Sequence, residues 1–131
     1  MIGLDTNIII RYLTQDDTEQ SIIATRIIEE ELTSLNTGFI TLIVLVEVVW
    51  VLKSCYKQDK TQLCHIVKSL LTTKQLSIEK GEYAHKALRL WQKGNGDFSD
   101  ALISILSLEI GCKYTLTFDK KADSVGMKLI N

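Results

Sequence analysis

Four carboxylates in the sequence stand where they could do chemistry. Asp5 and Asp119 each end a short apolar segment, MIGLD and KYTLTFD, and each precedes a polar turn. Asp100 lies early in GDFSDALISILSLEIG, and Glu47 lies inside the apolar run LIVLVEVVWVL. Carboxylates with no His or Cys beside them are typical ligands of hard divalent ions such as Mg²⁺ or Mn²⁺. Such an ion can activate a water and neutralise charge on a phosphate, which makes metal-dependent phosphodiester hydrolysis the natural hypothesis.

Glu47 is the acid that packing alone explains least well. If its segment is a helix, the residues one turn away are Ile43, Val44, Trp50 and Val51, and none of them is a cation. Moving an ionised carboxylate out of water is costly unless a partner compensates the charge. A distant Lys or Arg could be that partner, or the side chain could reach the rim of the helix. The remaining explanation is a divalent ion shared with other acids.

The other three acids have structural alternatives. Asp is common in turns, which is sufficient to place Asp5 and Asp119 at strand ends. Asp97 and Asp100 have the spacing of a capping box at a helix start, where the helix dipole also favours an anion. Each acid taken alone can be a turn or cap residue, so the case for chemistry depends on their occurring together.

The elements that must position these acids alternate along the chain. Short strands are predicted at 1–5, 38–41, 75–78, 113–119 and 126–130, and helices at 6–13, 18–32, 42–52, 59–72, 79–93 and 98–110. This alternation predicts an α/β fold with a mostly parallel sheet of about four to five strands, whose active site lies at the carboxyl ends of the strands.

The second predicted helix is amphipathic. Thr18 is its expected N-cap, because Thr commonly occupies that position. Spacings of three and four residues place one apolar set on the face expected to be buried. This set comprises Ile22, Ile23, Ile27, Ile28 and Leu32.

Composition narrows the class of protein. The 131 residues are 46% hydrophobic and 24% charged, which predicts a single compact domain over residues 1–131. The three widely spaced cysteines favour neither a disulfide framework nor a zinc site, and a reducing, cytoplasmic setting is expected. No apolar run reaches about 18 residues, so no membrane segment is expected. The net charge of −1 gives no global attraction to polyanions, so an RNA substrate would need local cations.

The segments MIGLDTNIIIRYL, LVEVVWVL, GDFSDALISILSLEIGC and YTLTFDKKA, in this order and spacing, resemble the PIN-domain family. Within that family they resemble the VapC-type toxins of prokaryotic toxin–antitoxin pairs. The resemblance covers essentially the whole chain and implies a three-layer α/β/α sandwich around the central sheet. It also implies a Mg²⁺- or Mn²⁺-dependent endoribonuclease, a homodimer, and a cognate VapB-type antitoxin whose tail covers the acidic site.

The family's acidic site residues match four positions here, Asp5, Glu47, Asp100 and Asp119. We expect Asp5 and Asp100 to contact the main metal directly. Glu47 and Asp119 are expected to hold it through water or to bind a second ion. Asp97 belongs to a pattern found in only part of the family, and is an auxiliary ligand or the helix N-cap.

Small polar residues and one cation complete the resemblance. Thr6, Asn7 and Thr117 match positions around the family's pocket, where they would orient carboxylates or waters. Thr6 and Thr117 can equally be ordinary strand-end residues. Arg11 matches a basic residue of the first PIN helix, and is a candidate contact with RNA phosphate or a surface salt-bridge partner.

Two other functions stay open on the sequence. One is a housekeeping RNA-processing PIN nuclease that has no antitoxin. The other is a catalytically silent PIN binding module that keeps the fold and the partner surface, although all four matched acids are present.

Overall fold

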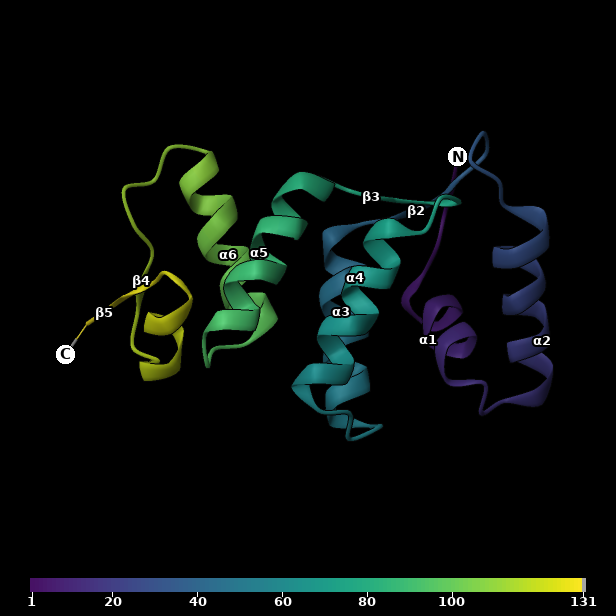
Figure 1. Cartoon of the computed structure of the whole chain (residues 1–131), viewed down its shortest axis with the longest axis horizontal. Coiled ribbons are helices and arrows are strands. Elements are labelled where there is room, and N and C mark those ends of the chain that lie inside the picture. The colour runs from purple at the N-terminus through teal and green to yellow at the C-terminus, as the bar shows by residue number, and fades with distance from the viewer. Residues whose placement is uncertain (131) are drawn as a thin grey trace. The chain divides into compact units, whose positions relative to one another are not determined.

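The computed structural model describes residues 1–130, which form two compact units that divide after residue 79. Each unit contains helices and its own parallel sheet, of three strands in the N-terminal unit and two in the C-terminal unit (Figure 1). The predicted α/β class and the parallel pairing of the strands are therefore confirmed.

The N-terminal unit is built around strand β2. Its elements are β1 (Ile2–Gly3), α1 (Thr6–Thr14), α2 (Thr18–Arg26), the π-helical turn η1 (Ile27–Glu31), β2 (Gly38–Ile40), α3 (Leu42–Ser54), α4 (Lys60–Thr72) and β3 (Leu76–Ile78). Strand β2 lies between β1 and β3 and pairs in parallel with both, with Gly38 opposite Ile2 on one side and opposite Leu76 on the other. The carboxyl ends of all three strands consequently lie at the same edge of this sheet.

Helices α1 and α3 carry much of the apolar core of this unit. Ile9 and Ile10 of α1 and Leu45, Val48 and Leu52 of α3 are buried. Helix α1 packs against both α2 and α3, and α3 packs against α4. The burial of these apolar side chains is the main favourable contribution to the packing of α1 against α3. The hydrophobic effect that drives this burial is not directional.

The second helix begins and ends differently from the sequence prediction. Asp17, not Thr18, is its N-cap, and the Asp17 carboxylate accepts a hydrogen bond of 2.9 Å from the Gln20 backbone N–H. At the other end the ladder widens into a π turn, in which the Leu32 N–H donates to the Ile27 carbonyl over 2.9 Å. This wider turn shifts the phase of the helix at its carboxyl end.

The predicted buried face of this helix is correct at Ile28 and Leu32, which are buried, but wrong in the part that became α2. Ile22 and Ile23 are 61% and 45% exposed, whereas Ser21 and Ala24 are buried. Ser21 can be buried because its hydroxyl donates to the backbone carbonyl of Arg11 over 2.9 Å. Two small residues and this internal hydrogen bond therefore face α1, and the two large side chains point to solvent.

The C-terminal unit has a smaller sheet and a core of its own. Its elements are α5 (Gly81–Lys93), α6 (Phe98–Glu109), β4 (Leu116–Thr117), the 3₁₀ helix η2 (Lys120–Val125) and β5 (Lys128–Leu129). Helix α5 packs against α6, and the Trp91 and Phe98 rings lie 5.1 Å apart between centroids at a tilt of 47°. Strands β4 and β5 pair in parallel, and both are shorter than the strands predicted at 113–119 and 126–130.

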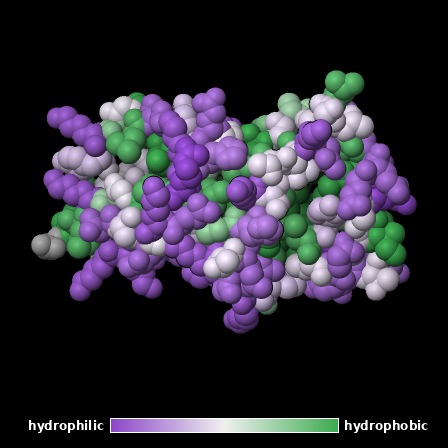
Figure 2. Space-filling model, in the orientation of Figure 1, coloured by the Kyte–Doolittle hydropathy of each residue, from purple (hydrophilic) through white to green (hydrophobic). Residues whose placement is uncertain are grey.

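The surface of the chain includes both hydrophilic and hydrophobic residues. In the view of Figure 2, hydrophilic residues predominate on both units and hydrophobic residues reach the surface in patches. Among the helices that the structure describes, none has both the length and the apolar character needed to cross a membrane.

The loop between α5 and α6 lies directly on η2. The Asn95 N–H donates to the Ser124 hydroxyl over 2.7 Å, and that hydroxyl donates to the Lys121 carbonyl over 2.7 Å. A Cβ atom at Gly94 would stand 2.7 Å from the Ser124 carbonyl oxygen and 2.8 Å from a Val125 methyl. The absence of a side chain at Gly94 therefore permits the loop to approach η2 this closely.

We predict that Gly94→Ala destabilises the chain, because the new methyl would collide with backbone of η2. The expected loss is about 1–3 kcal/mol in the free energy of unfolding, measured by urea titration. Gly81→Ala is the matched control, because nothing lies within 4 Å of a Cβ at Gly81. An equal loss in both variants would contradict the close contact described for Gly94.

Candidate functional site

Two of the predicted acids of the N-terminal unit lie against the same residue, Thr6. Asp5 follows β1 and is the N-cap of α1, where its Oδ1 accepts a hydrogen bond of 2.7 Å from the Thr6 N–H. The Thr6 hydroxyl donates over 3.0 Å to Oε1 of Glu47, which is on α3. Helix α1 thus begins between the two carboxylates, and Thr6 bridges them.

Glu47 is exposed, which corrects the assumption that its apolar segment is wholly buried. Helix α3 buries one face, and Glu47 lies on another together with Ile43 and Trp50, which are 74% and 63% exposed. The carboxylate can therefore remain hydrated, and it does not need an internal cation. Its one hydrogen bond in the described chain is the bond from Thr6.

Three predicted acids of the C-terminal unit lie at the starts of two helices. Asp97 is the N-cap of α6 and forms a capping box with Asp100, whose Oδ2 accepts from the Asp97 N–H over 3.2 Å. Asp119 follows β4 and is the N-cap of η2, where its Oδ1 accepts from the Lys121 N–H over 2.9 Å. The predicted N-cap role of Asp97 is confirmed; a role as ligand stays a prediction.

Asp100 has an unfavourable environment for its charge. Partial burial raises the pKa of the Asp100 carboxyl above its usual value, and the negative charges of Asp97 and Asp119 raise it further. The hydrogen bond from the Asp97 backbone acts in the opposite direction and does not offset these effects. A cation near Asp100 would relieve both the desolvation and the repulsion.

Each of the four matched carboxylates has one oxygen in a hydrogen bond and one oxygen without a partner among the described residues. The bonded atoms are Oδ1 of Asp5, Oε1 of Glu47, Oδ2 of Asp100 and Oδ1 of Asp119. None of these four side chains forms an ion pair with a Lys or Arg in the described part of the chain. Such oxygens fit the preference of Mg²⁺ and Mn²⁺, although no three acidic, His or Cys side chains of residues 1–130 are grouped closely enough to hold a metal ion.

The small polar residues differ in what they contact. Thr117 accepts a hydrogen bond of 3.0 Å through its hydroxyl from the Asp119 N–H, so it fixes the turn that carries Asp119. Thr6 holds Glu47, as described above. Asn7 is exposed in the first turn of α1, and its side chain has no hydrogen bond to any described residue. Two of the three predicted supporting residues therefore contact a site acid or its backbone.

Arg11 is held within a polar network at the far end of α1. Its Nε donates to the Gln20 side chain over 2.8 Å, and its Nη1 lies 3.3 Å from Oδ1 of Asp16. The salt-bridge alternative for Arg11 is thus observed. A contact with RNA phosphate stays a prediction, and it would have to use Nη2.

Two polar contacts of the N-terminal unit were not predicted from the sequence. Oε1 of Glu79, which follows β3, accepts a hydrogen bond of 2.9 Å from the Leu42 N–H at the start of α3. Tyr56 joins the Arg11 network by donating to Oδ2 of Asp16 over 2.7 Å. The position of Glu79 directly after a predicted strand was a usable signal. Tyr56 is 40 residues from Asp16, and no local pattern connects them.

Comparison with known proteins identifies the family of this chain. A family model described as PIN domain matches residues 2–128, a range that includes both units. This chain belongs to the PIN-domain family. It is also 24% identical over 128 residues to a protein of Aquifex aeolicus (strain VF5) named VapC ribonuclease, with 98% of this chain and 94% of that protein covered. The mixed α/β architecture with parallel sheets agrees with the α/β/α fold of PIN domains.

We predict that Asp119→Asn lowers the pKa of the Asp100 carboxyl in the metal-free PIN chain, because it removes one of the negative charges that raise it. Carboxyl ¹³C NMR titration measures this change. Asp123→Asn, an equal change of charge on η2, is the control and should leave the Asp100 pKa nearly unchanged. Equal shifts in both variants would mean that the proximity of Asp119 is not the cause.

Proposed function

We propose that this PIN-domain chain is a hydrolase that cleaves RNA phosphodiester bonds internally with Mg²⁺ or Mn²⁺. We further propose that it acts in the cytoplasm as the toxin component of a VapBC-type toxin–antitoxin pair. The PIN-domain match supports the nuclease part of this proposal. The similarity to a protein named VapC ribonuclease supports the toxin part.

One observation carries the chemical part of the proposal. Asp5, Glu47, Asp100 and Asp119 each keep one carboxylate oxygen without a protein partner and are not neutralised by a Lys or Arg within the described chain. A single acid that serves only as a helix cap can also use one carboxylate oxygen for the cap and leave the other without a partner. Asp17 and Asp59 do this at the starts of α2 and α4. Four that match the PIN motif residue by residue are better explained as metal ligands.

The four acids have distinct proposed roles. Asp5 and Asp100 would contact the main ion directly, Glu47 and Asp119 would hold it through water or bind a second ion, and Asp97 would be an auxiliary ligand. When bound, the ion supplies charge neutralisation at the phosphate and lowers the pKa of a water. Oxygen donors alone, without His or Cys, suit Mg²⁺ or Mn²⁺ better than Zn²⁺.

The chain's own residues orient these acids before any ion arrives. Thr6 donates to Glu47 and, through its backbone, to Asp5, so two carboxylates share one rigid helix start. Thr117 holds the backbone of Asp119 in its turn. Asp100 is fixed by its own bond from Asp97. Carboxylates held in this way lose little conformational entropy when a ligand binds.

We infer that both units belong to one PIN domain over residues 1–131. Support comes from the single family model that spans residues 2–128, and from the matched acids, of which each unit contributes two. As a VapC-type toxin, the chain would form a homodimer and bind a VapB-type antitoxin.

We predict that purified protein cleaves structured RNA with Mg²⁺ or Mn²⁺, and that Glu47→Gln reduces the rate by about 10–100-fold. Gln can still accept the Thr6 hydrogen bond, so the free energy of unfolding should change by less than about 1 kcal/mol. Glu30→Gln changes an exposed acid of η1 that has no partner among the described residues, so this control should retain full activity.

Two results of this assay would refute the metal mechanism. One is full cleavage in excess EDTA. The other is a Glu47→Gln variant as active as Glu30→Gln at equal stability.

We predict that expression of the chain alone slows bacterial growth, that Asp5→Asn abolishes this effect, and that co-expression of the cognate antitoxin relieves it. Growth curves with matched protein levels measure all three. An active nuclease that does not slow growth would favour a housekeeping PIN nuclease, and equal growth inhibition by Asp5→Asn would exclude cleavage as its cause.

A further inference from the structure

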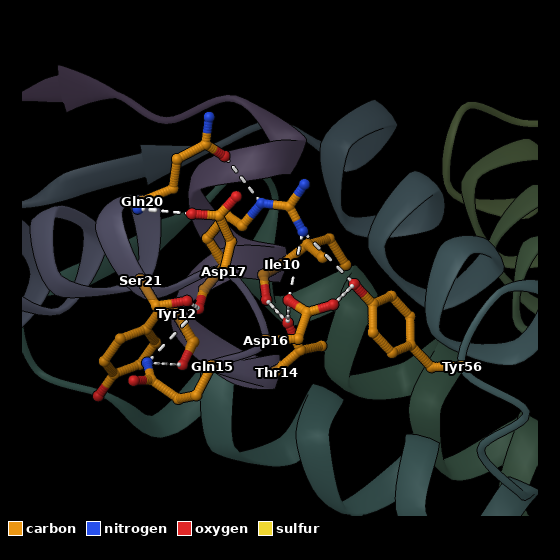
Figure 3. A network of polar contacts seen from close by, with 10 residues as sticks. Ile10, Tyr12, Thr14, Gln15, Asp16, Asp17, Gln20, Ser21 and Tyr56 are labelled. Carbon is orange, nitrogen blue, oxygen red and sulfur yellow. Dashed lines mark hydrogen bonds and ion pairs between the residues drawn. The ribbon is translucent and has the colours of Figure 1, made fainter.

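A polar network joins the end of α1 to the segment after α3. Arg11 and Thr14 of α1, Asp16 of the following loop, and Gln20 of α2 form one side of it, and Tyr56 is the contribution from beyond α3. Figure 3 shows the Tyr56 hydroxyl directed at the Asp16 carboxylate. The network therefore crosses between two helices that each carry an acid of the proposed site.

Both carboxylate oxygens of Asp16 accept hydrogen bonds. Its Oδ2 accepts from the Tyr56 hydroxyl over 2.7 Å, and its Oδ1 accepts from the Thr14 hydroxyl over 2.8 Å and from Arg11 over 3.3 Å. Arg11 Nη1 also lies 3.5 Å from the Tyr56 oxygen. The hydrogen bond from Tyr56, followed by that from Thr14, lowers the pKa of the Asp16 carboxyl. Asp16 is consequently held ionised between a tyrosine and an arginine.

This network contributes more to geometry than to stability. The Arg11 and Asp16 side chains are 31% and 46% exposed, and exposed ion pairs stabilise proteins little. The apolar contacts between α1 and α3 hold the two helices together, but the hydrophobic effect that drives them is not directional. Directional hydrogen bonds are what can fix this register.

Helices α1 and α3 are linked by polar bonds at two levels. Near the start of α1, the Thr6 hydroxyl reaches Glu47 on α3. Beyond the end of α1, Asp16 reaches Tyr56 after α3. Two links at separate levels constrain the rotation of α1 against α3 more than one link would, so the second link bears on the placement of Asp5 and Glu47.

We propose that Tyr56 is a positioning residue: by holding Asp16 and Arg11, it keeps α1 and α3 in the register in which Thr6 bridges Asp5 and Glu47. The inference rests on the proposed function, in which these two acids belong to the nuclease site. Tyr56 itself acts through Asp16 and Arg11 and touches neither acid.

The test compares Tyr56→Phe with Tyr12→Phe. Tyr12 is the matched control, because its hydroxyl donates to Glu29 over 2.8 Å, a tyrosine–carboxylate bond in the same unit that does not reach α3. The first readout is the carboxyl ¹³C resonance of Glu47 in metal-free protein, which should move in Tyr56→Phe and stay in place in Tyr12→Phe. The second is RNA cleavage with Mn²⁺, where kcat should fall about tenfold in Tyr56→Phe with little change in KM.

Asp16→Ala supplies an independent variant, because it breaks the same bond from an exposed loop position. Asp16→Ala should reproduce both effects. The double variant, which combines Tyr56→Phe with Asp16→Ala, should have a kcat no lower than that of the less active single variant. If Tyr56→Phe does not fold, Asp16→Ala decides the proposal.

The proposal is overturned if the Glu47 resonance is unchanged in Tyr56→Phe and Asp16→Ala, or if Tyr12→Phe produces equal effects at equal stability. A wild-type protein that cleaves no RNA would instead contradict the proposed function. In that case the Glu47 resonance alone decides whether Tyr56 positions α1 against α3.

Discussion

The start of a helix leaves backbone N–H groups without partners, and at α1, α6 and η2 acids of the PIN motif bind some of these groups. Asp5 caps α1, Asp119 caps η2, and Asp97 and Asp100 cap α6 between them. Because Asp5 and Asp119 also follow strands, the transition from strand to helix occurs at a carboxylate in both units. The structural and the functional explanations of these acids, which compete on the sequence, are compatible in the structure.

Capping also explains how acidic side chains can be held in place without being neutralised. A backbone N–H engages one carboxylate oxygen and leaves the charge of the group intact, whereas a Lys or Arg partner would cancel that charge. Glu47 is held in the same manner by a hydroxyl instead of a backbone N–H. A site that must receive a cation needs this combination of fixed position and retained charge.

Most of the fold and part of the site could be predicted from the sequence, because they depend on local signals. The glycines around α6, the spacing of Asp97 and Asp100, and the alternation of strands and helices are all short-range features. The errors arose where partners distant in sequence decide the outcome. Ser21 is buried because it finds a backbone carbonyl on α1, and this contact displaced the predicted face of Ile22 and Ile23.

The site shows the same division between local and distant signals. The acids were found as motif positions, whereas the Thr6 link to Glu47 joins residues 41 positions apart and is visible only in the structure. The link from Asp16 to Tyr56 spans 40 residues, with α2, η1, β2 and α3 between them, and its residue types occur commonly on protein surfaces. Such a pair can be recognised only in the three-dimensional structure.

The raised pKa of Asp100 has a thermodynamic consequence for the whole chain. Its folded state holds the Asp100 proton more tightly than the unfolded state does, so this group favours folding at a pH below its unfolded pKa. That contribution is lost as the pH rises through the higher, folded pKa, and at neutral pH the ionised carboxylate opposes folding. Any cation that binds the folded form selectively reverses this effect by mass action. The charge of Asp100 therefore lowers the stability of the folded chain at neutral pH.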